Sequence, residues 1–323
     1  MHDIVALGEL LIDFSPIGRS EQGSFRFEAN PGGAPCNVLA AARKLGHSAA
    51  FIGKVGQDIF GRYLKDTLDQ LEIDSSGLIL TPDYFTTLAF VTLDSEGNRD
   101  FSFARKNSAD VMLRAEEIPT ELIRKSRIFH CGTLSLTDSA CREATFKALD
   151  VAKSAGVVIS VDPNLREPLW PNMDDAKKAM ESVLAYADII KISDYELNFL
   201  YGPGEILSNA AKLMEQYRPQ MLFVTCGKDG AYLLRGGLVL QHPCFSEVKT
   251  IDTTGAGDSF CGTALSRLLE YGLNPGTMSV EQCRELLRYA SAAASLTTTK
   301  RGAITAMPTD AEIHALLERS PAV

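Results

Sequence analysis

Hydrophobic positions along the chain alternate between short continuous apolar runs and longer segments in which apolar residues recur every three or four positions. The short runs are typical of strands buried on both faces, and the longer segments are typical of amphipathic helices. Beyond residue 126 the rhythm is regular, with strands predicted at 127–131, 157–161, 189–192 and 221–225 and helices at 139–155, 174–185 and 206–217. This alternation predicts an α/β fold with a mainly parallel central sheet between two layers of helices.

The first hundred residues contain similar elements and two segments of another kind. Strands are predicted at 4–7, continued by 10–14, and at 51–55, and helices at 36–45 and 59–71. Residues 24–29 alternate apolar and polar side chains, as a half-exposed strand does, and 30–33 form a turn. Segments 86–93 and 100–104, with a turn at 95–98, predict an antiparallel hairpin. We expect the antiparallel pieces at about 10–30 and 85–105 to form a small β-sheet lid over the site.

One glycine-rich segment, Asp-Thr-Thr-Gly-Ala-Gly-Asp-Ser-Phe-Cys-Gly at 252–262, joins an extended run to an amphipathic helix. It places Gly255, Ala256 and Gly257 at a helix N-terminus, where unpaired amides and the helix dipole attract anions. Asp258 follows in the first turn. A carboxylate there suits an acceptor for the proton of an alcohol while the amides hold a phosphoryl group.

The same residues also suit an ordinary glycine turn capped by an acidic side chain, so the segment alone leaves both interpretations open. Two familiar phosphate motifs do not occur. No Gly-x-x-x-x-Gly-Lys-Ser/Thr run of a P-loop is present, and Phe260 stands where the dinucleotide fingerprint needs its third glycine.

A second cluster of small and polar residues lies near the N-terminus, where Gly-Gly-Ala-Pro-Cys-Asn starts a helix at 32–37. Polyol recognition needs both donors and acceptors, because each buried hydroxyl group donates and accepts. Asn37 as a simple helix cap and Asp13 as the end of a turn are equally open interpretations. The residues that offer this mixture are Asp13, Asn30, Gly32, Gly33 and Asn37.

Composition narrows the class of protein. The 323 residues carry a formal net charge of -9 with no cluster of Lys or Arg, which argues against nucleic acid as a partner. No apolar run approaches the ~20 residues of a membrane span. The seven scattered cysteines contain no Cys-x-x-Cys pair, so we expect buried reduced thiols in a soluble cytoplasmic protein.

Segments 32–61 and 252–263 together resemble the two signatures of the PfkB-type carbohydrate kinases, the family of ribokinases and fructokinases. The resemblance extends over essentially the whole chain and implies one ribokinase-like domain over 1–323, an αβα sandwich with a β lid. It also implies ATP-dependent phosphorylation of a hydroxymethyl group. Asp258 matches the family's base, and Gly255, Ala256 and Gly257 match its anion hole.

The resemblance also assigns a nucleotide side. Glu196 matches the glutamate that organises the Mg²⁺ shell through water. Many relatives have Asn where Ser193 stands, and often Asn where Ser291 stands near the adenine. Residues 225–230 fall where the family's nucleotide loop lies, although a simple turn between strands would look the same. The residues expected on the nucleotide side are Lys191, Ser193, Glu196, Thr225, Gly227, Lys228, Gly230, Gly255 and Gly257.

Two arginines and an asparagine complete the expected site. Asn164 and Arg166 lie in Asp-Pro-Asn-Leu-Arg, which resembles the fructokinase version of that segment. Arg166 suits neutralisation of the transferring phosphoryl group, because its charge is permanent and its donors fork onto oxygens; a surface salt bridge is the alternative. Arg105, at the end of the lid hairpin, is expected to reach the sugar or to close the lid.

A monovalent-cation site is a further implication of the resemblance. Asp252 and Thr254, with the loop that contains Gly302, match the family's K⁺-binding segment. An ion there would set the backbone of the anion hole, but the same residues could cap the helix without one.

The sugar is inferred from four segments that resemble fructokinases, the bacterial ones in particular, more than ribokinases; they are 8–14, 108–111, 162–166 and 297–303. Fructose is therefore the expected substrate, with ribokinase and 2-keto-3-deoxygluconate kinase as alternatives. A sugar-sensing protein without catalysis is the alternative of another class, and a nicotinamide oxidoreductase lacks its fingerprint. Unpaired lid edges also favour a homodimer through the lid.

Overall fold

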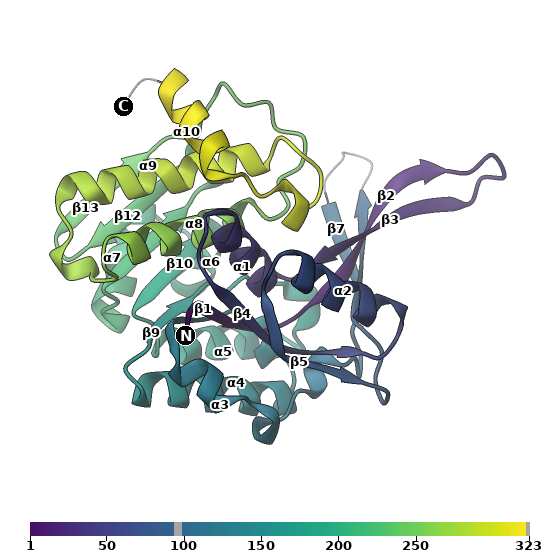
Figure 1. The fold of residues 1–323 in the computed structure, drawn as a ribbon. Helices are drawn as coiled ribbons and strands as arrows, with labels where there is room; N and C mark the ends of the chain where they lie inside the picture. Colours follow the sequence, from purple (N-terminus) through teal and green to yellow (C-terminus); the bar gives the residue numbers. More distant parts are fainter. Residues whose placement is uncertain (94–98, 321–323) are drawn as a thin grey trace.

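The computed structural model describes residues 1–93 and 99–320, and its main feature is a nine-stranded sheet in the order β13-β12-β11-β10-β9-β8-β1-β4-β5 (Figure 1). Its seven strands from β11 to β5 pair in parallel, and β12 and β13 add antiparallel at one edge. The strands are His2–Leu7 (β1), Ala49–Gly56 (β4), Asp74–Thr81 (β5), Ser126–Cys131 (β8), Val158–Val161 (β9), Ile189–Ser193 (β10), Met221–Thr225 (β11), Ala231–Arg235 (β12) and Leu238–His242 (β13).

Helices cover both faces of this sheet, because its strands are apolar on both sides. In β1, Val5 and Leu7 pack into one core, and Ile4 and Ala6 pack into the core on the opposite face. The first core includes helices α3 (Thr120–Arg124), α4 (Ser139–Ser154), α5 (Met173–Leu184), α6 (Asp194–Tyr201) and α7 (Ile206–Tyr217). The second includes α1 (Ala34–Lys44), α2 (Ile59–Gln70), α8 (Ala256–Glu270) and α9 (Val280–Thr297), with α10 (Asp310–Arg319) outside α9. The predicted αβα sandwich is confirmed.

A separate four-stranded sheet in the order β3-β2-β6-β7 forms the lid. Its strands are Leu11–Arg19 (β2), Phe25–Gly32 (β3), Leu88–Leu93 (β6) and Arg99–Ala104 (β7). β2–β3 and β6–β7 are antiparallel pairs, and they join through parallel pairing of β2 with β6 at Ile12 and Leu88. Figure 1 shows the β2–β3 hairpin extending away from the body. The turn predicted at 95–98 lies outside the described residues.

Two local predictions are wrong. Residues 10–14 do not continue the first strand: the chain leaves the large sheet at Gly8, where a Cβ would lie 2.6 Å from Cγ of Pro35, and enters the lid. Asn30 to Gly32 form no turn, because they pair with β2 as the end of β3. Three strands were not predicted: β5, which starts with polar residues, and the hairpin β12–β13.

Six of the seven cysteines are buried and Cys244 is exposed, and none is in a disulfide. The expectation of free thiols is confirmed, and the expectation that all are buried is wrong for Cys244. In the part of the chain that the structure describes, no helix combines the length and apolarity needed to cross a bilayer.

Candidate active site

A cavity of about 770 Å³ lies where the chain leaves the carboxyl ends of β1, β9, β10 and β11 and meets the N-terminus of α8. Ligands of doubly wound sheets bind at this edge, and the volume is in the range of small-molecule sites. Of the residues expected at the site, the cavity is lined by Asp13, Gly33, Asn37, Asn164, Arg166, Lys191, Ser193, Glu196, Thr225, Gly227, Lys228, Gly230, Thr254, Gly255, Ala256, Gly257 and Asp258.

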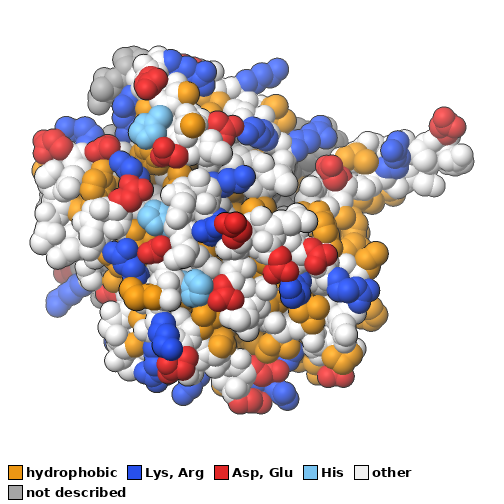
Figure 2. Space-filling model, viewed as in Figure 1, with side chains coloured by type: hydrophobic (Ala, Val, Ile, Leu, Met, Phe, Trp, Pro, Cys, Tyr) orange, Lys and Arg blue, Asp and Glu red, His pale blue; other side chains and the backbone are white. Residues whose placement is uncertain are grey.

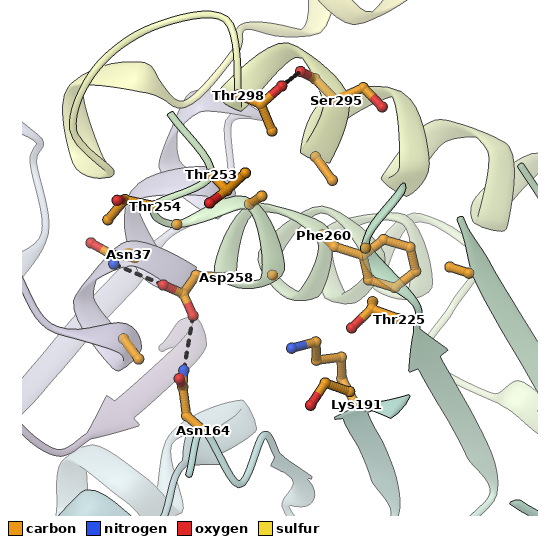
Figure 3. A pocket seen from close by; sticks show the side chains of 18 of the residues that line it. Asn37, Asn164, Lys191, Thr225, Thr253, Thr254, Asp258, Phe260, Ser295 and Thr298 are labelled. Carbon is orange, nitrogen blue, oxygen red and sulfur yellow. Dashed lines mark hydrogen bonds between the residues drawn. The ribbon is translucent and has the colours of Figure 1, made fainter. Parts of the chain in front are cut away.

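The cavity has two ends, which differ in the residues that line them. The lid end consists of Glu9, Leu11, Asp13, Asn37, Phe103, Leu134 and Asn164, and the α9 end consists of Thr225, Gly227, Gly230, Phe245, Ser291, Ala294, Ser295 and Thr298. Asp258 and the start of α8 lie between them (Figure 3). A molecule bound at each end would therefore meet the other at Asp258.

The start of α8 presents backbone amides to the cavity. Gly255 caps the helix with a φ of 76°, a left-handed conformation that glycine adopts without strain. A Cβ on Gly255 would also lie 2.7 Å from Cβ of Ala303. The amide of Ala256 donates to the carbonyl of Thr253 at 3.3 Å, whereas no hydrogen bond within the described residues occupies the amides of Gly255 and Gly257. Unpaired amides at a helix N-terminus form an anion site.

The carboxylate of Asp258 is held by two side-chain amides (Figure 3). Nδ2 of Asn37 donates to Oδ2 at 2.8 Å, and Nδ2 of Asn164 donates to Oδ1 at 3.0 Å. Asn37 lies on α1 and Asn164 on the loop after β9, so three distant segments meet here. One donor holds each oxygen of this buried carboxylate. The orientation of Asp258 in the cavity is therefore set before any ligand binds.

Both asparagines have features that suit asparagine in particular. Asn164 has a φ of 52°, a left-handed conformation that Asn tolerates better than most residues. The Oδ1 atom of Asn37 is buried and accepts no hydrogen bond from the described residues. A buried acceptor in that state is expected to gain a donor, such as a hydroxyl group, from a bound molecule.

A buried ion pair lies beside the start of α8. Nζ of Lys191, in the middle of β10, is 3.0 Å from Oδ2 of Asp162, which follows β9, and both side chains are almost fully buried. Burial raises the pKa of Asp162 to about 7; Lys191 opposes the shift, and Glu196 and Asp258 add to it. Burial would lower the pKa of Lys191, but the three carboxylates outweigh burial and raise it.

Glu196 completes the N-terminal cap of α6 and also holds the loop that follows β9. Its Oε1 accepts from the amide of Leu165 at 2.7 Å, and its Oε2 accepts from the amide and hydroxyl of Ser193 at 2.8 and 2.7 Å. Ser193 also caps α6, accepting from the amide of Glu196. Ser193 therefore has a hydrogen-bonding role with Glu196 in this structure.

At the α9 end, backbone and small side chains dominate. Gly230 has a φ of 92°, and a Cβ there would lie 2.1 Å from the carbonyl oxygen of His242, so only glycine fits this turn. α9 contributes Ser291 and Ala294, Thr298 follows at its C-terminal end, and Phe245, which packs against α9, also lines the cavity. The hydroxyl of Ser291 is buried without a partner in the described part of the chain. This end can accept a flat, largely apolar group.

Five expected residues are not among those that line the cavity: Asn30, Gly32, Arg105, Asp252 and Gly302. Arg105 donates instead to Asp110 at 2.8 Å, to the hydroxyl of Thr137 and to the carbonyl of Leu134, so it braces the base of the lid. Gly32 packs so tightly on Asp13 that a Cβ would be 2.2 Å from Oδ2.

Asp252 links two loops. Its Oδ1 accepts from the amide of Thr254 at 2.8 Å and its Oδ2 from the amide of Gly302 at 3.3 Å. These bonds tie the segment before α8 to the loop after α9. Asp252 therefore has a structural role that needs no bound cation, which is one of the two roles that the sequence left open.

Glu9 and Asp162 are two titratable residues near the site that sequence reasoning missed. Glu9 lines the lid end, is only 4% exposed, and accepts from the amide of Ala34 at 2.9 Å. Burial raises the pKa of Glu9 to about 7, although Arg105 opposes the shift. The signal in the sequence that could have identified Glu9 is a carboxyl group placed just after a buried strand. Asp162 occupies the same kind of position after β9.

The pfkB family carbohydrate kinase model matches residues 1–310 of the chain. The chain belongs to this family. A probable fructokinase-2 of Arabidopsis thaliana is 43% identical over 322 residues, covering 98% of this chain and 95% of that protein. Fructokinase-1 of Zea mays is 41% identical over 322 residues, covering 98% of each.

Solved structures of sugar kinases have the same fold. The fructokinase of Xylella fastidiosa with bound ATP has a TM-score of 0.89 and 31% identity, covering 98% of this chain and 99% of that one. A fructokinase of Vibrio cholerae with fructose, ADP and calcium ion has a TM-score of 0.86 and 32% identity, again covering 98% and 99%. This member of the pfkB family is therefore a carbohydrate kinase, a phosphotransferase.

Proposed function

We propose that this protein is an ATP-dependent fructokinase that converts fructose to fructose 6-phosphate within one kinase domain. The observation that carries the proposal is Asp258, held by two asparagines beside unpaired amides in a cavity of suitable size. The choice of fructose is supported by the fructokinase relatives from Arabidopsis thaliana and Zea mays. ATP as donor is supported by the Xylella fastidiosa structure.

The sugar occupies the lid end and ATP the α9 end, with the phosphates over the turn of Gly227 and Gly230. Asp13 and Asn37 hold sugar hydroxyls, and Asp258 takes the proton of the attacking hydroxymethyl group. The amides of Gly255 and Gly257 hold the transferring phosphoryl group, and Arg166 adds a permanent positive charge. Arg166 lines the cavity, where its Nη1 donates to the carbonyl of Leu165.

Magnesium fits this site when ATP and water supply most of its ligands. No group of three or more His, Cys, Asp or Glu side chains in the described part of the chain is placed to hold a metal ion. Glu196 already accepts three hydrogen bonds, which suits contact through a water molecule. A bound Mg²⁺ supplies positive charge that offsets the charge of the transferring phosphoryl group.

We include potassium in the proposal, at the loops of Asp252, Thr254 and Gly302. It is supported by a Vibrio cholerae fructokinase double mutant crystallised with fructose, ADP and potassium ion. Turnover in potassium chloride is expected to exceed turnover in tetramethylammonium chloride at equal ionic strength. Equal rates in the two salts would remove the ion from the proposal.

Parallel assays with fructose, ribose and 2-keto-3-deoxygluconate test the reaction. With each sugar at the same limiting concentration, ADP release in a coupled assay should be fastest with fructose, and the product should carry its phosphate on the C6 hydroxymethyl oxygen. Inactivity with fructose beside turnover of another sugar would reassign the substrate. Tight sugar binding without ATP turnover would instead favour a sugar-sensing protein.

We also propose a homodimer through the lid. β3 and β7 are the edge strands of the lid sheet, and unpaired edges invite strand pairing. Phe25 on β3 and Phe85 before β6 are among the exposed large apolar side chains. Figure 2 shows hydrophobic side chains gathered where the projecting hairpin meets the body. Light scattering should give twice the chain mass, and a monomer at working concentration would contradict the proposal.

A further inference from the structure

The ion pair of Lys191 and Asp162 is unusual because both side chains are buried, at 8% and 2% exposure. Burial removes both charges from water, and their mutual attraction offsets this loss only in good geometry. A pair of apolar residues would fill the same space without that cost. Packing alone therefore does not explain why a charged pair occupies this buried position.

The position of the ammonium group supplies one. A Cβ on Gly257 would lie 2.9 Å from Nζ of Lys191, so the ammonium occupies the space beside the second glycine of the α8 N-terminus. Lys191 also lines the cavity that contains Asp258. Figure 3 shows its nitrogen pointing toward the first turn of α8 and the carboxylate of Asp258. The cation thus lies beside Gly257 in the first turn of α8.

The surrounding groups keep this charge in place. Asp162, Glu196 and Asp258 all stabilise the protonated form of Lys191. His130, on β8, is buried with its pKa lowered to about 3, so it adds no positive charge. Glu196 and Asp258 accept hydrogen bonds from other donors, whereas the partner of the Asp162 carboxylate is Lys191, whose Nζ lies 3.0 Å from Oδ2. Asp162 is therefore the group that fixes the ammonium.

We propose that Lys191 is a further catalytic residue, whose ammonium contacts the phosphoryl group in transit, and that Asp162 is its positioning residue. The proposal rests on the kinase function proposed above. In the transfer, the bond from phosphorus to the bridging oxygen of ADP breaks as the bond to the hydroxymethyl oxygen forms. The hydroxyl proton passes to Asp258, and Lys191 keeps its protons throughout.

A preset cation of this kind acts mainly on the transition state, where charge on the transferring group is redistributed. Its loss should lower kcat more than it weakens binding of either substrate. A purely structural ion pair would instead change stability, or the affinity for both substrates, without a selective effect on kcat.

The main test compares Lys191→Met with Lys178→Met, which removes an exposed lysine of α5. Lys191→Met should lower kcat for fructose by ~10²–10³-fold, the range for loss of one charge-stabilising donor. The KM for fructose and the Kd for ADP should change by less than about threefold. Lys178→Met should match the wild type. Lys191→Arg keeps the charge and should recover at least about tenfold of the lost kcat.

A binding measurement gives a readout that does not depend on turnover. Wild-type protein with ADP and fructose should bind aluminium fluoride, a planar mimic of the phosphoryl group, at least about tenfold more tightly than Lys191→Met. Asp162→Asn should show the same loss in kcat and in aluminium fluoride affinity, with the Kd for ADP retained. If Lys191→Met does not fold, Asp162→Asn tests the proposal by these two measurements.

Three results would overturn the proposal. They are a kcat of Lys191→Met within about threefold of wild type, a loss confined to the KM for ATP, and equal weakening of ADP and aluminium fluoride binding. Wild-type protein that phosphorylates none of the sugars would overturn the proposed function instead. The two failures are therefore distinguishable.

Discussion

The lid end and the α9 end of the cavity are built in opposite ways. At the lid end, polar side chains from distant segments bind one another: Asn37 and Asn164 hold Asp258, and the amide of Ala34 holds Glu9. At the α9 end, glycine turns and small side chains leave a space bounded by the backbone, Ala294 and Phe245. The lid end, where we propose that the sugar binds, is thus shaped by paired polar side chains, whereas the α9 end, where we propose that ATP binds, is shaped by glycines and small side chains.

This difference predicts different responses to substitution. A site of fixed polar groups should lose rate when one group is removed, because orientation is lost along with the contact. A slot defined by small residues should lose affinity when it is filled, with the chemistry unchanged. The following predictions test that division, in order of decreasing effect.

Asp258→Asn should lower turnover by ~10²–10⁴-fold or more, because it removes the proton acceptor. The new amide would also face the donor of Asn37 or Asn164 with a donor of its own. Rates are measured at saturating fructose and ATP, with the exposed Asp66→Asn on α2 as the control. Near-normal turnover of Asp258→Asn would refute the assigned base.

Glu9→Gln should raise stability more at about pH 8 than at about pH 5. In the wild type, the carboxyl ionises near 4.5 in the unfolded chain but at about 7 when folded. Stability is therefore lost as the pH rises through that window, and glutamine, which keeps the acceptor for Ala34, avoids the loss. The gap in unfolding free energy should grow by about 2–3 kcal/mol.

Denaturant unfolding of Glu9→Gln and wild type at both pH values measures that gap. Arg105 and Asp110 act on the same carboxyl, and Asp66→Asn, which removes an exposed carboxylate on α2, is the control for general pH effects. A gap that is constant between the two pH values would show that Glu9 is ionised throughout.

Asn164→Ala and Asn164→Gly should both lower kcat by about tenfold to a hundredfold, since a hydrogen bond to a charged group contributes ~1.5–3 kcal/mol. Only alanine is strained at the φ of 52°, so Asn164→Ala should also unfold about 1–2 kcal/mol more easily than Asn164→Gly. Kinetics and denaturant unfolding of the pair separate the two effects. Equal stability of the two variants would contradict the strain, and unchanged kcat would contradict the orienting role.

Ala294→Leu should weaken ATP binding by about tenfold, or ~1.4 kcal/mol, because the larger side chain fills the α9 end. The kcat at saturating ATP and the KM for fructose should stay within about twofold. Ala311→Leu, on the exposed side of α10, is the matched control. A fall in kcat with ATP affinity retained would remove the distinction between the two ends.

Much of the fold was predictable because strands buried on both faces leave a plain apolar signal. The four strands predicted beyond residue 126 and the helices between them agree with the structure within about one residue. β5 was missed because its first half, Asp-Ser-Ser-Gly, is polar, and β12–β13 because a hairpin of two antiparallel strands interrupts the alternation of strands and helices. Asn30 to Gly32 were assigned to a turn by composition, although pairing with β2 decides their conformation.

The candidate site was predictable where local backbone chemistry carries it. Gly255, Gly257 and Asp258 could be placed from a helix start and two glycines alone. Arg105 was misplaced because nothing near it in sequence shows that Thr137 and Leu134 receive its donors. Lys191 was expected only as part of a nucleotide segment. Its contact with Asp162 and Gly257 crosses three segments and has no local sequence signal.

The sequence by itself determined the periodicities, the anion-binding helix start and the family signatures, because each depends on residues within one or two turns of chain. Only the tertiary structure decided which charges meet. Asn37, Asn164 and Asp258 are brought together, and Lys191 is set beside Gly257, by the packing of helices on a sheet. Coulombic and hydrogen-bond energies depend on separation in space, and separation along the chain does not specify it.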